Sequence, residues 1–260
     1  MSVLRLNLLK EQLNELGFDF IQGHIETFMH DTSRKDEPFL ESLLSLFDME
    51  IQQRRQRATD TRLKISNIPE IKELEEFNVE EVEGVTQKKL NELAEMNFVE
   101  GKENIIIQGP NGVGKSHLLV SLARKACREG YSVYYKNCMD MIEDLMVANS
   151  QNKLKRKINT YRKHKILIIE KVCYSNMSVE QADLFFQVVA ARYEKGSIMI
   201  ETNRPFAAWG EKMGEVSIAA AIVDRLLHHA HVIVLKGDSY RLKKRLANGL
   251  LPQANEFGVY

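Results

Sequence analysis

Cysteine, proline and long apolar runs are all scarce in this chain of 260 residues. The three cysteines, Cys127, Cys138 and Cys173, are widely spaced and form neither a C-x-x-C pair nor a metal-like pairing with histidine. No apolar run approaches the ~18 residues of a membrane helix, and the first leucines alternate with polar residues, unlike a signal peptide. We therefore expect a soluble, cytoplasmic protein with free thiols and no membrane partner.

Net charge is also absent, because Lys and Arg number 36 and Asp and Glu number 36. The total charge therefore says nothing about partners, and only the distribution of charge along the chain can. The hydrophobic content of 44% is enough for a sizeable core. The length suits one α/β domain of ordinary size with a smaller appendage.

What the chain does contain is a phosphate-binding loop. Residues 109–116 read GPNGVGKS and fit G-x-x-x-x-G-K-[ST] at every constrained position. The glycines let successive backbone N–H groups point at phosphates, Lys115 reaches the β- and γ-phosphates, and Ser116 offers its hydroxyl to Mg²⁺. This pattern predicts a nucleoside triphosphate site. The predicted nucleotide-binding residues are Gly109, Pro110, Asn111, Gly112, Val113, Gly114, Lys115, Ser116 and His117.

The flanking segments fit this motif, since an apolar run at 105–107 precedes it and leucines at helical spacing follow it. Further strand-like segments alternate with helical ones, which predicts a five-stranded parallel α/β sheet flanked by helices. The four further strand segments are 131–135, 166–169, 197–200 and 232–235.

The N-terminal part is expected to be a small all-helical domain that binds DNA or a partner. Leu4, Leu8, Leu9, Leu13 and Leu16 recur at helical spacing and predict one apolar helix face. We predict domains at 1–76 and 77–245, and a C-terminal tail at 246–260.

The catalytic carboxylates depart from what a phosphate-loop ATPase requires. The strand 166–169 ends in Glu170-Lys171, where an Asp-Glu pair is expected to hold Mg²⁺ and polarise water. Glu170 can still serve magnesium, but a protonated Lys171 is no general base. Either the chain hydrolyses little, or Glu201 near the end of the neighbouring strand stands in, compensated by an ion pair with Lys171. Asn203 suits a group that orients water at the γ-phosphate, or else a helix cap.

Several charged residues can be interpreted either as ordinary surface or packing residues or as functional residues. Arg225 is a surface arginine or a finger that completes a neighbour's site. His228, His229 and His231 suggest a metal, but no nearby carboxylate or cysteine completes a site, which favours structural packing. Two basic clusters are solvated faces or DNA contacts. Their candidate DNA-binding residues are Arg54, Arg55, Arg57, Lys153, Lys155, Arg156, Lys157, Arg162 and Lys163.

The chain resembles the IstB-type transposition helper ATPases, in the AAA+ clade that also holds DnaC-type helicase loaders and DnaA-type initiators. The resemblance spans nearly the whole chain. It is carried by GPNGVGKSHL (109–118), DLFFQVVAARYEKGS (183–197), TNRPFAAWGE (202–211), DRLLHHAHVI (224–233) and KGDSYRLK (236–243).

The resemblance implies a P-loop (AAA+) core that binds ATP and Mg²⁺, forms a homo-oligomer around duplex DNA and recruits or regulates a transposase. It makes Lys115 and Ser116 the Walker A residues, Glu170 the Walker B position, Asn203 the first sensor and Arg225 the arginine finger. Arg241 is a further candidate near the nucleotide. The basic clusters become phosphate contacts without sequence preference.

Two other functions remain open at this point. One is a helicase loader, whose partner is a replicative helicase. The other is a nucleotide-gated DNA scaffold without hydrolysis, which Lys171 favours, because the family reads Asp-Glu where this chain has Glu170-Lys171.

Overall fold

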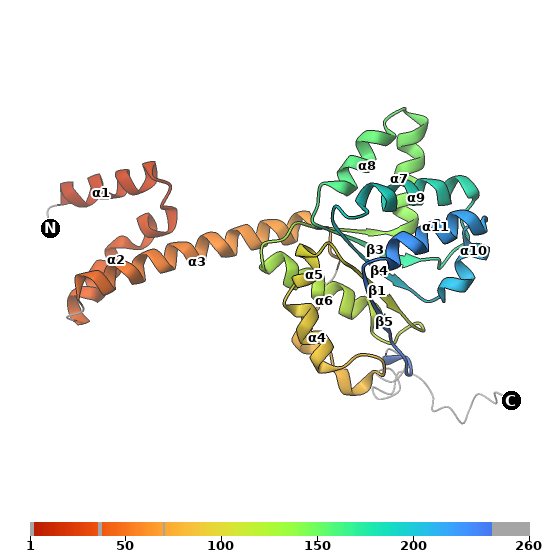
Figure 1. Ribbon diagram of the computed structural model, residues 1–260. Helices are drawn as coiled ribbons and strands as arrows, with labels where there is room; N and C mark the ends of the chain where they lie inside the picture. Colours follow the sequence, from red (N-terminus) through yellow and green to blue (C-terminus); the bar gives the residue numbers. More distant parts are fainter. Residues whose placement is uncertain (1–2, 36–37, 70, 241–260) are drawn as a thin grey trace, which may run out of the picture. The chain divides into compact units, whose positions relative to one another are not determined.

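The computed structural model describes residues 3–35, 38–69 and 71–240, and the chain divides into two compact units, residues 1–61 and 62–260. The first unit is helical, as expected. Its helices are α1 (Val3–Glu15), α2 (Asp19–Lys35) and α3 (Phe39–Ile65), and the division falls in the last turn of α3 (Figure 1). None of the described helices is long and apolar enough to cross a membrane.

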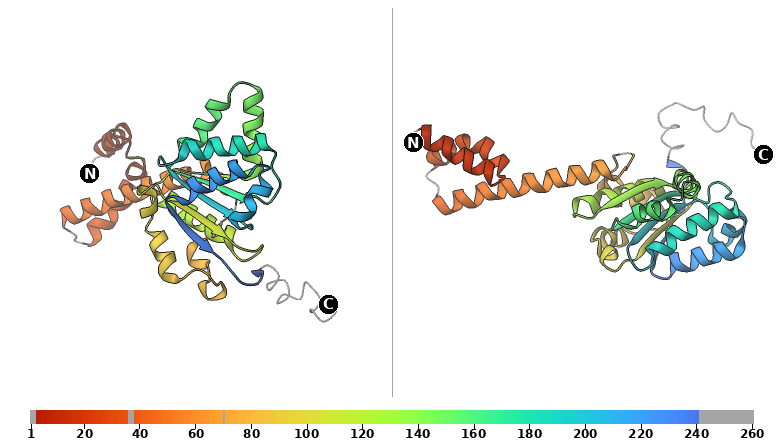
Figure 2. Two further views of the ribbon diagram at one scale, coloured as in Figure 1. Left: turned by 45° about the vertical axis from the view of Figure 1, so that its right-hand side comes forward. Right: turned by 90° about the horizontal axis from the view of Figure 1, so that it is seen from above.

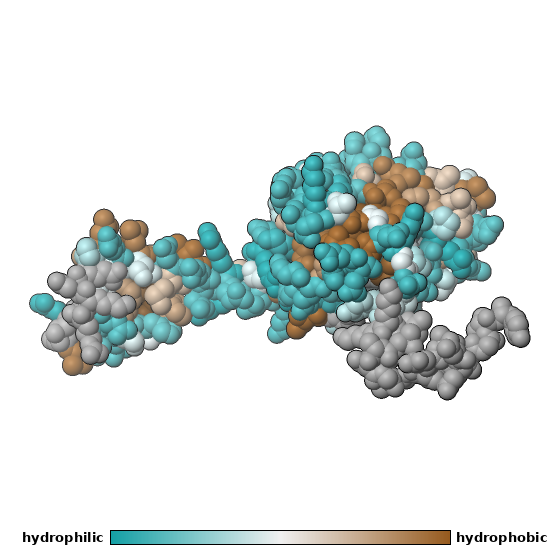
Figure 3. Space-filling model, turned by 90° about the horizontal axis from the view of Figure 1, so that it is seen from below, coloured by the Kyte–Doolittle hydropathy of each residue, from teal (hydrophilic) through white to brown (hydrophobic). Residues whose placement is uncertain are grey.

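The core of the first unit is small, and the predicted leucine face of α1 is only partly buried. Leu9 and Leu13 pack against the buried Ile21, Ile25 and Leu46. The predicted helix is present, but the remaining leucines of this face are exposed, because α1 packs on α2 along one side only. These exposed leucines are Leu4 (81%), Leu8 (55%) and Leu16 (68%). Figure 3 shows hydrophobic side chains on the surface of this unit.

The second unit contains the predicted five-stranded parallel sheet, in the order β2-β3-β4-β1-β5. The three central strands, β3, β4 and β1, each contain a short, buried apolar run, as expected for strands covered on both faces. The strands are β1 (Asn104–Gln108), β2 (Val133–Asn137), β3 (Ile166–Val172), β4 (Ser197–Thr202) and β5 (Ala230–Val234).

Helices cover both faces of this sheet (Figures 1 and 2), and alternate residues of each strand face opposite ways. Ile105 and Ile107 point into the core under α4–α6, whereas Ile106 points into the core under α7–α11. The helices of the first face are α4 (Gln87–Ala94), α5 (Asn97–Glu100) and α6 (Lys115–Arg128). Those of the second are α7 (Cys138–Ser150), α8 (Leu154–Arg162), α9 (Val179–Arg192), α10 (Trp209–Lys212) and α11 (Val216–Leu227).

Short 3₁₀ turns complete the unit, at η1 (Leu74–Glu76), η2 (Val79–Glu81) and η3 (Phe206–Ala208). The segment before the sheet belongs to the second unit, because Leu63, Ile68 and Leu74 pack against its core. Glu73 anchors this segment to α6, since its carboxylate lies 2.9 Å from Arg124 Nη2 and 2.7 Å from Arg128 Nη1. The hydrogen bond from Arg128, together with that from Arg124, lowers the pKa of Glu73 although partial burial opposes this.

The strand order determines which residues meet at the carboxyl ends of the strands. β4 lies directly beside β1, with Ile107 opposite Glu201 and Gln108 opposite Thr202. The Gly109 N–H then donates to the Thr202 carbonyl at 3.2 Å. The end of β4 therefore lies against the phosphate loop, at the edge of the sheet where ligands of open α/β folds bind.

Candidate nucleotide-binding site

The phosphate loop joins β1 to α6 and has the backbone conformation that its glycines permit. Gly109 has φ +157°, and a Cβ there would lie 2.4 Å from the Leu235 carbonyl oxygen. Gly114 has φ +108° and immediately precedes Lys115, the first residue of α6. The start of this 14-residue helix therefore presents free N–H groups toward the loop, an arrangement suited to phosphate.

A cleft of ≈ 1180 Å³ opens beside the loop, large enough for a nucleotide. The predicted residues from Asn111 to His117 line it, as do Glu170, Lys171 and Glu201. Lys115 is 4% exposed and its ammonium donates to the Pro110 carbonyl at 2.8 Å. The structure thus brings the loop and the carboxylates of two strands together in one cavity.

Several aromatic and acidic residues of this cleft were not identified from the sequence. Phe77 contacts the His117 ring edge-on, with centroids 5.6 Å apart, and Tyr174 lies with its ring 5.8 Å from Lys115 Nζ. The N–H of Tyr240 donates to the Gly112 carbonyl at 3.0 Å. Phe77 interrupts an acidic stretch of the sequence, and that isolated aromatic residue is the signal that could have identified it. The overlooked lining residues include Phe77, Val82, Tyr135, Tyr174, Asp238 and Tyr240.

Glu201 is the carboxylate that contacts the last residue of the phosphate loop. It is the penultimate residue of β4, is 1% exposed, and accepts a hydrogen bond from Ser116 Oγ at 2.7 Å. Burial raises the pKa of Glu201, and the nearby Glu170 raises it further, while the hydrogen bond from Ser116 opposes both. A buried carboxylate on the Walker A hydroxyl is a group poised to accept a cation.

The donor set fits magnesium. The Ser116 hydroxyl and the carboxylates of Glu201 and Glu170 all line the same cleft, and they are the hard oxygen ligands that Mg²⁺ takes. Glu170 is largely buried, with 15% of its side chain exposed.

A β-bulge separates Glu170 and Lys171 from the ladder with β4. Ile169 pairs with Ile200 and Val172 with Thr202, so two residues of β3 lie opposite the single residue Glu201. Lys171 has φ +60°, a left-handed conformation that is unusual for lysine. The ion pair of Lys171 is with Glu170, Nζ to Oε2 3.7 Å, and our expectation of a pair with Glu201 is wrong. The bulge takes Lys171 out of the β3–β4 register, and the hydrogen-bond partner of Glu201 is Ser116.

Asn203 follows β4 directly and lies beside the phosphate loop. Its Nδ2 is 3.5 Å from Asn111 Oδ1, and its own Oδ1 is buried with no hydrogen-bond partner in the described part of the chain. This buried amide oxygen can accept a hydrogen bond from a water or from a ligand group at the loop.

Comparisons with known proteins identify the family of this chain. A sequence profile of the family described as IstB-like ATP binding protein matches residues 11–248. The chain belongs to this family. It is 38% identical to the ATP-binding protein of insertion sequence IS21 from Pseudomonas aeruginosa, over 92% of this chain and 90% of that one. It is 37% identical to that of insertion sequence IS232 from Bacillus thuringiensis subsp. berliner, over 90% and 94% of the two chains.

Solved structures support the fold of this IstB-like chain at low sequence identity. The crystal structure of DnaI aligns with a TM-score of 0.53 and 19% identity, over 64% of this chain and 91% of that one. DnaA from Aquifex aeolicus with bound AMPPCP aligns with a TM-score of 0.51 and 23% identity, over 71% and 57%. The predicted P-loop sheet of the AAA+ type is therefore confirmed.

The remaining predicted residues of the IstB-like chain lie outside the cleft. Arg225 is in the last turn of α11, just before β5 begins. It therefore lies at the amino ends of the parallel strands, whereas the phosphate loop lies at their carboxyl ends. Its Nη1 donates to the Ala221 carbonyl at 3.0 Å and its guanidinium lies 4.7 Å from the centre of the Phe186 ring. Arg225 thus does not reach the nucleotide cleft of its own chain. Arg241 lies outside the described residues.

The basic residues are exposed, but some already have acidic partners. In the first unit Arg54 Nε donates to Glu50 at 2.8 Å, and Arg57 lies 3.5 Å from Asp19, whereas Arg55 is simply exposed. In the second unit Lys157 pairs with Asp144 at 2.9 Å. The other predicted basic residues, all exposed along α8 and its ends, are Lys153, Lys155, Arg156, Arg162 and Lys163.

Proposed function

We propose that this chain is an ATP-binding AAA+ helper of transposition with slow ATP hydrolysis, in which Glu201 on β4 supplies the magnesium-side carboxylate that the family keeps on β3. The observation that carries this proposal is the 2.7 Å hydrogen bond between Ser116 Oγ and the buried Glu201. In a phosphate-loop ATPase the Walker A hydroxyl and a strand-end carboxylate hold the magnesium shell together. When bound, Mg²⁺ neutralises charge on the β- and γ-phosphates.

The slow step is attributed to Glu170 and Lys171. Glu170 lines the cleft and is the second strand-end carboxylate there, which we propose polarises water, but the Lys171 ammonium lies 3.7 Å from it. An ion pair with this cation makes the Glu170 carboxylate less available to accept a proton from water, as a general base must. Asn203, with its unpartnered Oδ1, is proposed to orient the attacking water.

The position of Arg225 supports a proposal about assembly. Because it lies at the end of the sheet opposite its own cleft, we propose that it completes the site of a neighbouring subunit as an arginine finger. We therefore propose a homo-oligomer joined at nucleotide sites. The exposed basic residues of α8 are proposed to contact DNA phosphates, and such contacts weaken as salt rises.

The insertion-sequence origin of the relatives is the reason for choosing a transposase as the partner over a replicative helicase. A pull-down with a purified transposase and with a replicative helicase, each with and without ATP, distinguishes the two. Capture of the helicase alone would contradict the transposition role while leaving the nucleotide site intact.

The decisive experiment for the site is steady-state phosphate release with and without duplex DNA. Wild type is compared with Glu201→Gln, Lys171→Ala and, as the control for ATP binding, Lys115→Ala. We expect slow turnover in wild type, none in Glu201→Gln and faster turnover in Lys171→Ala. Wild type that binds ATP and DNA but stays silent, with unchanged silence in Lys171→Ala, would instead support a non-hydrolysing scaffold.

A further inference from the structure

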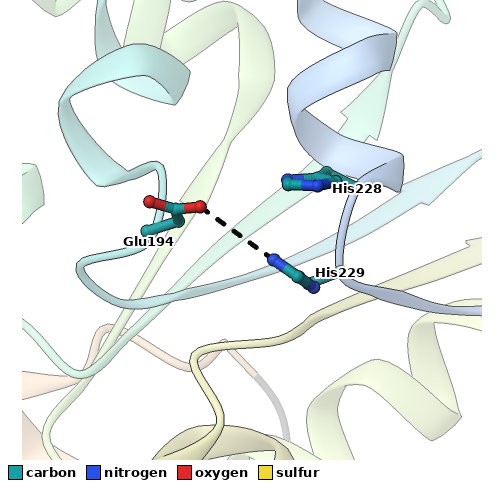
Figure 4. A group of neighbouring side chains, drawn as sticks. All are labelled: Glu194, His228 and His229. Atoms are coloured by element: carbon teal, nitrogen blue, oxygen red, sulfur yellow. Dashed lines mark ion pairs between the residues drawn. The ribbon is translucent and has the colours of Figure 1, made fainter.

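Three side chains of residue types that commonly bind metals converge at the amino ends of the parallel strands, opposite the end that carries the phosphate loop. Figure 4 shows Glu194, which follows α9, facing His228 and His229, which end α11 and lead into β5. One possible ligand atom from each of these three residues lies within 4.8 Å of those of the other two. The expectation that no carboxylate accompanies these histidines is therefore wrong, because the fold brings Glu194 from a distant part of the sequence.

The spacing between His229 and Glu194 differs from that of a hydrogen bond. His229 Nε2 lies 4.0 Å from Glu194 Oε1, too far for a direct hydrogen bond. Bonds of about 2.0–2.2 Å from zinc to nitrogen and oxygen place two ligand atoms roughly 3–4 Å apart across the ion. The same pair of residue types occurs at His231 and Glu103, where Nε2 and Oε2 are in direct contact at 2.7 Å. Only the first of these two pairs has room for an ion between its ligand atoms.

Tyr193 orients one of the histidines. The Tyr193 hydroxyl and His228 Nδ1 form a hydrogen bond, and the two rings stack at an interplanar angle of 17°. When Nδ1–H is the donor, the Nε2 atom of His228 carries the lone pair that a metal requires. This is the arrangement in which a residue behind a metal ligand fixes its tautomer. All three ligand residues are exposed, so a hydrated ion can reach them.

We propose that Glu194, His228 and His229 form a site for one transition-metal dication of the zinc class, with water completing its coordination. Two imidazoles and one carboxylate suit Zn²⁺, Co²⁺ or Ni²⁺ better than the oxygen-seeking Mg²⁺ of the nucleotide cleft. A bound ion would join the ends of α9 and α11. Arg225 lies in the last turn of α11 against Phe186 of α9, so the ion would also restrain this arginine. The importance of restraining Arg225 rests on the proposed function, in which this arginine completes a neighbouring site. The metal site itself does not depend on that function.

The test is a titration of the full, chelator-treated chain, without a polyhistidine tag and without nucleotide, with Co²⁺ followed by its visible absorption. Zn²⁺ is measured in parallel by calorimetry. We expect one equivalent to bind, with affinity falling about 100-fold in Glu194→Gln and in His229→Ala, and about 10-fold in Tyr193→Phe. His231→Ala is the matched control and should bind as wild type does.

Absence of saturable binding at millimolar Co²⁺ would overturn the proposal, and so would binding that survives Glu194→Gln and His229→Ala. Equal loss in His231→Ala would place the ion elsewhere and overturn it too. Circular dichroism of each variant separates loss of the site from loss of the fold. Because nucleotide is absent, these results do not depend on whether the chain hydrolyses ATP.

Discussion

Among the residues that the structure describes, each unit has one glutamate that is only 1% exposed, and folding shifts the pKa values of these two glutamates in opposite directions. In the first unit Glu50 accepts hydrogen bonds from the Ile21 N–H at 3.0 Å and from Arg54 Nε at 2.8 Å. Burial alone would raise the pKa of Glu50, but these hydrogen bonds and the charge of Arg54 outweigh it and lower the pKa. In the second unit Glu201 has the Ser116 hydroxyl, and burial leaves its pKa raised.

This difference separates a structural charge from a functional one. Glu50 ties α3 to the start of α2, and its charge is compensated within the fold. Lys171, the cation nearest in sequence to the nucleotide carboxylates, pairs with Glu170 and leaves Glu201 to the Walker A hydroxyl. An incompletely compensated buried carboxylate is costly unless a ligand supplies the missing cation, which is the reason to assign Glu201 to magnesium.

The largest expected effect concerns hydrolysis. Glu201→Gln keeps the side-chain shape but removes the charge, and it should lower phosphate release about 100-fold or more, to background. Glu50→Gln is the control from the other unit and should leave turnover within about twofold of wild type when measured well below the unfolding transition. Equal losses in both variants would show that the comparison between the two glutamates is mistaken.

Next in size is the stability of the first unit. Glu50→Ala leaves the buried Ile21 N–H without its acceptor and removes one partner of Arg54, which keeps its hydrogen bond to the Gly17 carbonyl, so it should destabilise this unit by about 2 kcal/mol. Hydrogen exchange at the amides of α2 and α3 measures this loss locally. Unchanged protection there would mean that Glu50 is not the structural charge described above.

A smaller effect is expected at Lys171. Replacing it by alanine frees Glu170 for water and should raise turnover about 10-fold, equivalent to about 1.4 kcal/mol of activation free energy. Lys212→Ala is a matched control, because Lys212 is a half-buried lysine that hydrogen-bonds Asn176 and does not line the cleft. Slower hydrolysis in Lys171→Ala would assign the lysine to phosphate binding rather than to inhibition.

The smallest effect is a pH dependence of opposite sign at the two glutamates. Because the pKa of Glu201 is raised on folding, its ionised form destabilises the folded state. This loss of stability begins as the pH rises above the ordinary Glu pKa of about 4.3. Glu201→Gln should therefore raise the Tm by about 2–4 °C at neutral pH, and this gain should vanish near pH 4.

The pKa of Glu50 is lowered on folding, so its ionised form stabilises the folded state. This stabilisation is fully present above the ordinary Glu pKa and is lost as the pH falls through the lowered pKa of the folded state. Thermal melts of wild type, Glu201→Gln and Glu50→Gln between pH 4 and pH 8 check both signs. A Tm gain in Glu201→Gln that is independent of pH would rule out ionisation as its cause.

The sequence predicted the sheet and the phosphate loop because both depend on local patterns. Apolar β-branched runs identify buried strands, and the loop requires its glycines, Lys115 and Ser116 at fixed spacing. The same local reasoning failed for α1, since helical spacing alone does not say that only Leu9 and Leu13 of the predicted face find a partner.

By itself, then, the amino-acid sequence determined that this chain builds a parallel P-loop sheet and which residues form the loop, and it showed that Glu170 and Lys171 replace the usual Asp-Glu pair. Only the tertiary structure decided which carboxylate meets Ser116. One extra residue in β3 removes Lys171 from the ladder, and the neighbouring position of β1 and β4 delivers Glu201 instead. Strand order and bulges arise from contacts between distant segments, and such contacts leave no local pattern in the sequence.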